Sequence, residues 1–150
     1  MAVGLALAGC TAGVPLATTS PHTASSAPVE TSTQGCVNAT RLADASSGVI
    51  RAGEFAPNQG HWSQPGGTKF WVGSTNEAAS MSGATIETVL IGSSHPAHVQ
   101  HRPMGQQATV DTLPVFFPGV LRLDVPGLWR ITVTIADDTG CFLIDAVTER

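Results

Sequence analysis

Residues 129–135 contain the clearest pattern in the chain, a strict alternation of apolar and polar side chains. Because successive side chains of a β-strand point to opposite faces, this period of two predicts a strand with one buried face. An acidic hairpin connection over residues 137–140 and a returning strand over residues 141–147 follow directly. The returning strand places Phe142, Ile144 and Ala146 on one side. The pattern therefore predicts an antiparallel hairpin that covers a hydrophobic core.

Shorter segments of the same kind precede this hairpin, and glycine and proline separate them. We expect strands over residues 69–73, 84–91, 109–117 and 121–125, and a weaker one over residues 49–55. Pro114 interrupts the third of these, which predicts an edge strand or a bulge. There is no convincing amphipathic helix, although residues 38–45 could form one or two helical turns. Six or seven short strands joined by turns predict an all-β, antiparallel β-sandwich.

A turn, an aromatic residue and a hairpin follow one another in the last part of the chain. Pro126-Gly127 is followed by Trp129, by the acidic connection at residues 137–140 and by a closing strand at residues 142–147. This order resembles the last three strands of immunoglobulin-like (Ig-like) bacterial modules. In many such modules the aromatic residue is Tyr, whose hydroxyl bonds back to the backbone. The resemblance implies an Ig-like sandwich that keeps the apolar bulk of Trp129 in its core and lacks that hydroxyl.

The core expected from these strands contains two of the three tryptophans. We expect Trp129 to be buried against Leu123, Ile131 and Phe142. Trp71 lies in a predicted strand and is expected in the core as well.

The chain begins with a short apolar run that ends in Leu7-Ala8-Gly9-Cys10. This ending resembles the processing signal of bacterial lipoproteins, although no Lys or Arg precedes the run. The resemblance implies that residues 1–9 are the remnant of a cleaved signal peptide and that Cys10 carries lipid. It also implies a protein anchored in the membrane through that lipid, on its extracytoplasmic face.

A linker rich in Ala, Ser, Thr and Pro follows the lipidated cysteine. Residues 10–35 have too little apolar surface to offset the entropy of ordering, so we expect a disordered tether. As a flexible coil it would span roughly 25–30 Å. The Ig-like sandwich is then expected to occupy residues 36–150.

Two cysteines remain if Cys10 carries lipid, namely Cys36 and Cys141. An even pair in an extracytoplasmic protein predicts a disulfide. The alternative is two unpaired thiols. In a sandwich the terminal strands often meet, so the two Cα atoms are expected within about 7 Å of each other.

Charge excludes two classes of partner. Charged residues make up 12% of the chain and the formal net charge is −4, which argues against nucleic-acid binding. The small number of Lys and Arg also argues against a polybasic membrane patch.

Three of the five histidines, His95, His98 and His101, lie within seven residues, and Met104 follows. Imidazole and thioether groups bind Cu and Zn, so these four residues form a candidate metal site. Their spacing is not that of a structural zinc site. The alternative is a solvated polar loop, which Pro96 and Pro103 favour.

No motif points to catalysis. The chain lacks the Gly-x-Ser-x-Gly motif of hydrolases, and no Ser, His and Asp residues stand out as a triad. We therefore expect a protein that is not an enzyme: a binding or interaction module whose partner is an envelope protein or a cell-wall component. The alternative is an envelope lipoprotein that binds Cu or Zn through His95, His98 and His101.

Overall fold

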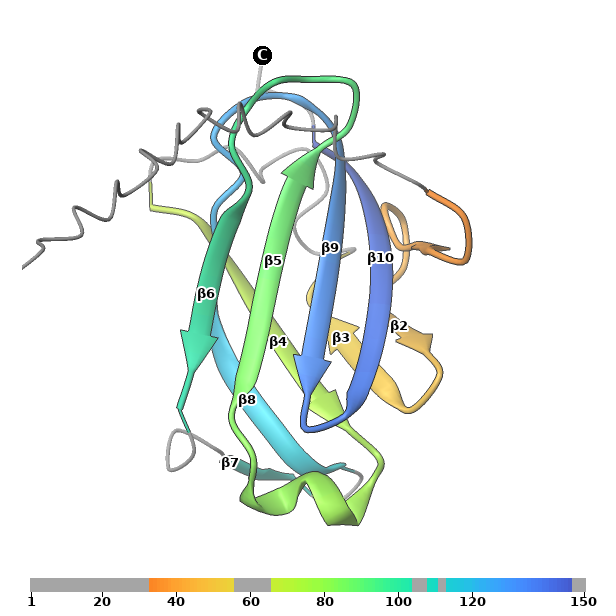
Figure 1. Ribbon diagram of the computed structural model, residues 1–150, viewed down its shortest axis with the longest axis vertical. Helices are drawn as coiled ribbons and strands as arrows, with labels where there is room; N and C mark the ends of the chain where they lie inside the picture. Colours follow the sequence, from red (N-terminus) through yellow and green to blue (C-terminus); the bar gives the residue numbers. More distant parts are fainter. Residues whose placement is uncertain (1–32, 56–65, 104–107, 111–112, 147–150) are drawn as a thin grey trace, which may run out of the picture.

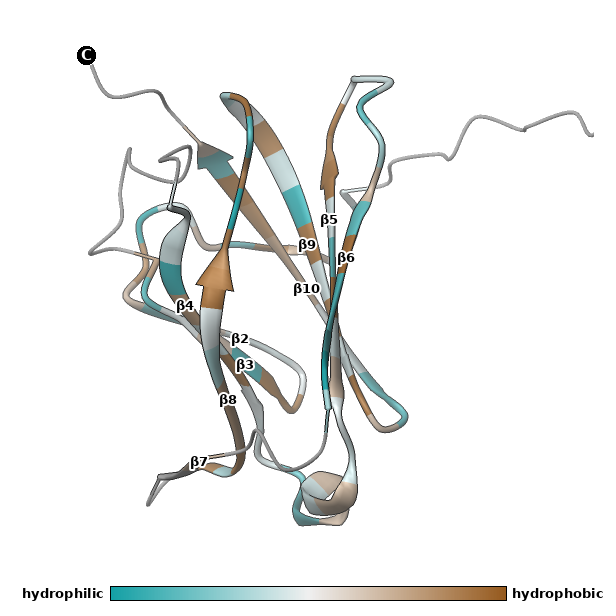
Figure 2. Ribbon diagram, turned by 90° about the vertical axis from the view of Figure 1, so that its left-hand side faces the viewer, coloured by the Kyte–Doolittle hydropathy of each residue, from teal (hydrophilic) through white to brown (hydrophobic). Residues whose placement is uncertain are grey.

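The computed structural model describes residues 33–55, 66–103, 108–110 and 113–146. These residues form two five-stranded sheets packed face to face (Figures 1 and 2). The prediction of an all-β, mainly antiparallel sandwich is confirmed. The predicted signal remnant and Cys10 lie outside the described residues, as does nearly all of the predicted tether.

The first sheet has the strand order β1-β10-β9-β5-β6. Its neighbouring strands are antiparallel, except that β1 runs parallel to β10. The bounds of its strands are β1 Val37–Asn38, β5 Ala84–Leu90, β6 His98–Arg102, β9 Gly127–Ile135 and β10 Asp138–Ala146.

The second sheet has the strand order β2-β3-β4-β8-β7 and is antiparallel throughout. A short 3₁₀ helix, η2 (Glu77–Met81), connects β4 to β5 and so crosses from this sheet to the first. In immunoglobulin lettering, β3-β4-β8-β7 follows the order A-B-E-D and β5-β9-β10 the order C-F-G. The strand bounds are β2 Asp44–Ser47, β3 Ile50–Gly53, β4 Thr68–Ser74, β7 Ala108–Val110 and β8 Leu113–Leu121.

The core lies between the two sheets and follows the predicted alternation. Along β9 the odd-numbered residues from Trp129 to Ile135 are buried and the even-numbered ones are partly exposed. Trp129 is 1% exposed, which confirms the prediction that it lies in the core. From the second sheet and its connections, Phe55 and Phe70 extend the core, and Phe55 contacts both Phe70 and Phe142 through their rings.

Trp129 lacks the tyrosine hydroxyl but still bonds back to the backbone, through its indole nitrogen. Its indole Nε1 donates a hydrogen bond of 2.9 Å to the carbonyl oxygen of Val125. The bond spans the corner that leads from β8 into β9, because Val125 lies four residues before Trp129. An indole N–H thus ties this corner in the way a tyrosine hydroxyl does in Ig domains.

The hairpin between β9 and β10 turns earlier than predicted. Asp138 pairs with Ile135, so the turn consists of Ala136 and Asp137 alone, and residues 138–140 belong to β10. Ala136 adopts a φ of +54°, which a non-glycine residue rarely does. The turn therefore uses Ala136 at a positive φ. The sequence predicted a turn over residues 137–140, where Asp and Gly adopt such conformations more often.

Three further predictions about local structure are wrong. Residues 122–126 form no strand, because Leu121 ends β8 and no neighbouring strand pairs with the extended chain that follows. Leu123 is nevertheless buried, which explains the alternating pattern there. Residues 38–45 form no helical turns but belong to β1, β2 and their connection. Residues 109–117 belong to two strands, β7 and β8, instead of one, although the register between them shifts between Leu113 and Phe116, which confirms the bulge predicted at Pro114.

Cys36 and Cys141 form a disulfide, which confirms the predicted pair. Their Cα atoms lie 4.6 Å apart, although 105 positions separate the two cysteines in sequence. Cys36 immediately precedes β1, and Val37 pairs with Phe142 of β10. The bond therefore holds the two-residue strand β1 against the edge of the first sheet, whereas the conserved bond of antibody domains joins the two sheets.

Candidate functional site

The three histidines of the candidate metal site lie on a strand and the connection before it. His98 and His101 belong to β6, and His95 lies between β5 and β6. Residues three positions apart on a strand point to opposite faces. His101 contacts the outward-facing Thr85 through its Nδ1 atom, 3.2 Å from the Thr85 hydroxyl, while His98 pairs in register with the buried Thr88. The prediction of a loop here is wrong for residues 98–102.

His95 packs against the core instead of joining the other two histidines. Its ring meets the indole of Trp129 edge to face, with centroids 5.8 Å apart and an angle of 82° between the rings. Its Nε2 atom lies 4.0 Å from a carboxylate oxygen of Asp124. His95 therefore covers one edge of Trp129 at the corner described above.

The structure does not assemble the candidate metal site. Among the residues that it describes, no three His, Cys, Asp or Glu side chains are placed to hold a metal ion together. Met104, the fourth predicted ligand, lies outside the described residues. No helix in the described part of the chain is long and apolar enough to cross a membrane.

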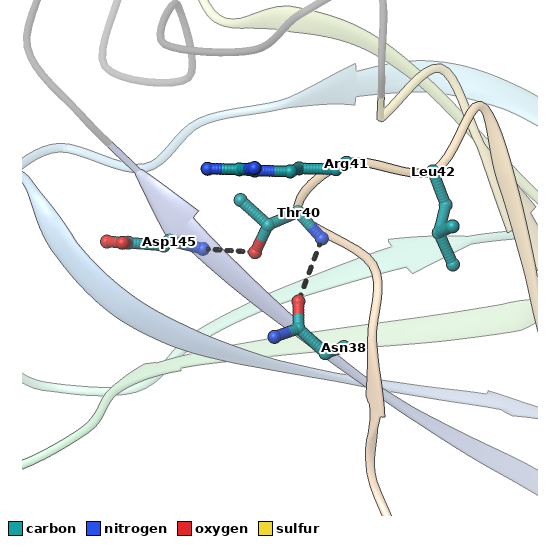
Figure 3. A pocket seen from close by; sticks show the side chains of 5 residues that line it. All are labelled: Asn38, Thr40, Arg41, Leu42 and Asp145. Carbon is teal, nitrogen blue, oxygen red and sulfur yellow. Dashed lines mark hydrogen bonds between the residues drawn. The ribbon is translucent and has the colours of Figure 1, made fainter.

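A hollow of ≈ 470 Å³ lies at the connection between β1 and β2 (Figure 3). Thr40 stands at its centre: its backbone N–H donates to Asn38 Oδ1 at 3.2 Å, and its hydroxyl accepts from the Asp145 N–H at 3.0 Å. These bonds attach the connection to β10. Arg41 and Leu42 complete a lining that is mainly polar, unlike the apolar lining of most ligand pockets. The hollow is therefore better explained by the attachment of the β1–β2 connection to β10 than by ligand binding.

Trp71 lies on the outer face of the second sheet, so the prediction that it belongs to the core is wrong. Along β4, Phe70 and Val72 are buried, and Trp71 between them is only partly buried. Lys69, which shares the outward side with Trp71, is exposed. The alternation of β4 thus sends the indole away from the core.

Phe116 of β8 lies beside Trp71 on the same outer face. The two ring centroids are 5.4 Å apart and the rings are inclined by 35°. Pro118 pairs in register with Trp71 and is exposed, and Val120 on the same side is 42% exposed. We call Trp71, Phe116, Pro118 and Val120 the aromatic face.

Glycine residues of β3 and β4 lie next to the aromatic face and contribute no side chains beside the rings. Gly53 of β3 pairs in register with Trp71, and a Cβ atom added there would overlap the indole. The indole and the carboxylate of Asp44 therefore share the space that a side chain at Gly53 would fill. Gly73 separates Arg51 from Phe116 in the register of the sheet and contributes no side chain between them.

Basic side chains border the aromatic face. Arg51 lies on the outward side of β3, and its Nε atom is buried with no hydrogen-bond partner within the described ranges. Lys69 is 80% exposed and lies 3.6 Å from Glu54. Arg122 is exposed two residues beyond Val120, close to Gly67. Three cations thus flank the rings from both ends of β4 and β8, and two carboxylates lie among them: Glu54 beside Lys69, and Asp44 beside the indole.

The sequence held a weak signal for this face. Residues 70–72 and 115–117 are runs of apolar residues, so alternation alone does not show which members face outward. The residues two positions from Trp71 are Lys69 and Gly73, whereas Phe70 is two positions from Thr68 and Val72. The exposed Lys69 was the one available marker of the outward side.

Chemically, the aromatic face is suited to recognition, because large rings and cations contribute most of the binding energy at many interfaces. Comparisons of the chain with protein-family models, with curated proteins and with solved structures find no match.

Proposed function

We propose that this protein is a non-enzymatic binding module of the bacterial cell envelope, anchored by lipid at Cys10, and that the aromatic face contacts its partner. The observation that carries the proposal is the position of the pair Trp71 and Phe116 on the outside of the second sheet. The partner is an envelope protein or a cell-wall component.

The energetic argument concerns the cost of leaving rings in water. A large aromatic side chain that is fully buried gains about 1.5–3 kcal/mol over one left exposed. Trp71 and Phe116 give up part of that gain in the free protein. A partner that covers them recovers it, and Trp is among the residues enriched at such contacts.

The anchor and the disulfide support a location outside the cytoplasm. Lipid on Cys10, with two or more acyl chains, would hold the protein stably at a membrane. The predicted tether would let the domain reach partners roughly 25–30 Å away. The Cys36–Cys141 bond suits an oxidising compartment.

The interaction is tested by capture from solubilised envelopes with the purified full-length chain. We expect Trp71→Ala to lose the partner that the unchanged protein retains. Thr132→Ala, on the outward side of β9 in the first sheet, is the matched control and should retain it. Equal capture by Trp71→Ala, with a melting temperature near that of the unchanged protein, would refute the proposal.

The anchor is tested separately by Cys10→Ser. We expect this change to move the protein from the membrane fraction to the exported soluble fraction and to remove acyl mass from it. If the variant stays membrane-bound after washing at high salt, and the unchanged protein carries no acyl mass, the anchor at Cys10 is wrong.

A further inference from the structure

We infer that the aromatic face binds an extended glycan of β-linked pyranose units that carries carboxylate groups. This inference rests on the proposed function, since it names the chemical class of the partner. Three observations carry it: the geometry of the two rings, the low glycine-lined surface around them and the cations at both ends.

The ring geometry suits sugars. A β-linked pyranose ring presents an apolar face of C–H groups, and such a face stacks on an aromatic ring. Trp71 and Phe116 lie on adjacent strands with centroids 5.4 Å apart, similar to the distance between successive units of an extended β-linked glycan. With 35° between the ring planes, the two rings can each meet one of two successive units, since such a chain also twists from unit to unit.

The surface around the rings leaves room for a chain of sugars. The indole lies across Gly53, so it follows the sheet instead of standing out from it. Gly73 adds no side chain beside Phe116, and the other members of the aromatic face are the compact Pro118 and Val120. A low, open strip along β4 and β8 fits an extended polymer better than a small molecule, which most proteins enclose in a concave pocket.

The charges favour an acidic glycan. The chain has a formal net charge of −4, yet around the aromatic face three cations, Arg51, Lys69 and Arg122, outnumber two carboxylates, Asp44 and Glu54. Arg51 has an Nε atom with no hydrogen-bond partner in the described ranges, and an arginine side chain can hold a carboxylate through paired N–H groups. Carboxylates on the glycan would complement this grouping.

The same charges do not suit an anionic membrane. Segments that bind acidic lipids electrostatically carry about four to eight clustered cations. The aromatic face has three, and two carboxylates lie among them: Glu54 is 3.6 Å from Lys69, and Asp44 lies beside the indole.

The experiment compares two hexasaccharides that differ only in carboxylates. One is a β-1,4-linked glucose hexamer, and the other is the same hexamer with its C6 hydroxymethyl groups oxidised to carboxylates. Each is titrated into the purified full-length chain by calorimetry at low salt. We expect the oxidised hexamer to bind at least tenfold more tightly than the neutral one.

The variants separate ring stacking from charge. Trp71→Ala and Phe116→Ala should each weaken binding of the oxidised hexamer at least tenfold. The exposed pair Lys69→Gln with Arg122→Gln should lower the affinity for the oxidised hexamer and leave that for the neutral one unchanged. Arg130→Gln, on the outward side of β9 in the first sheet, should change neither.

The outcomes also distinguish this inference from the proposed function. If neither hexamer binds and protease treatment of the envelope abolishes capture that depends on Trp71, the partner is a protein and the glycan inference is overturned, while the proposed function stands. If the hexamers bind equally to the unchanged protein and to Trp71→Ala, the aromatic face is not the site and the inference is also overturned. If Trp71→Ala captures the partner as well as the unchanged protein does, both the proposed function and this inference fail.

Discussion

The outer faces of the two sheets differ far more than the inner ones. In the first sheet, Thr139, Thr134 and Thr85 lie side by side in register across β10, β9 and β5, and His101 of β6 continues the row. The outward residues of its described strands include no Phe or Trp. The corresponding row of the second sheet contains Trp71 and Pro118, next to Phe116.

The contrast shows what the fold requires and what it leaves open. Both sheets must bury their inner faces, and the rings of Phe55, Phe70 and Phe142 pack together there. An antiparallel sheet with one solvated face normally places mainly polar residues on it, and the described outer face of the first sheet combines Thr and charged residues with the aliphatic Val99 and Leu128. The sandwich does not need aromatic rings on the outside of the second sheet, which is why we look for their role in binding.

The largest effect is expected from the inner tryptophan. Trp129→Ala removes a side chain that is 1% exposed together with its hydrogen bond to Val125, and should cost about 3–5 kcal/mol of unfolding free energy. Urea denaturation followed by circular dichroism measures this. A near-neutral change would mean that the core does not depend on Trp129 and would remove the contrast between inner and outer rings.

Loss of the disulfide should have the next largest effect, and its local effect should be confined to the edge of the first sheet. Replacing Cys36 and Cys141 together by Ser is expected to cost about 2–5 kcal/mol. The two-residue strand β1 pairs only with β10 among the described strands, so it should lose protection first. Hydrogen exchange should show the largest loss of protection at Val37 and Asn38, while β3 and β4 of the second sheet lose no more than the drop in global unfolding free energy accounts for. Equal loosening of both sheets would contradict the local role of the bond.

Replacing Trp71 by Thr, a residue found on the outer face of the first sheet, tests the difference between the two outer faces directly. Trp71→Thr should cost only about 1 kcal/mol, because it removes one outer ring pair and no core contact. The matched change on the other face, Thr134→Ala, removes a contact of 3.4 Å to Thr139 and should cost about 0.2–1 kcal/mol. Melting temperatures of the two variants should therefore lie close together. A loss for Trp71→Thr as large as that for Trp129→Ala would mean that the ring belongs to the core.

The smallest effect concerns metal binding at the edge of the first sheet. His98 and His101 point to opposite faces of β6, and His95 packs on Trp129. We expect calorimetric titration with Cu(II) and Zn(II) to give the same weak affinity for the unchanged protein and for a variant with all three histidines replaced by Ala. Tight binding that the triple variant loses would give this edge a function of its own.

The sequence determined those parts of the protein in which the local residue pattern agrees with the need to bury apolar side chains. Strict alternation marked β9 and placed Trp129 inside, because a period of two can bury only one face, and the β-branched composition of residues 84–91 marked β5. The compartment suggested by the first ten residues, together with an even pair of cysteines, was enough to predict the Cys36–Cys141 bond. Neither prediction needed to know which strands are neighbours.

Strand pairing decided the rest. Trp71 and Phe116 stand in apolar runs, and only the register of β4 with β3 and β8 shows that their side chains point outward. Residues 121–125 alternate like a strand, yet no neighbour pairs with residues 122–125. His98 and His101 lie between prolines and still form a strand, because β5 offers them a partner. Backbone hydrogen bonds between strands and the direction of each outward side chain depend on residues far apart in sequence, so tertiary structure alone assembled the candidate site.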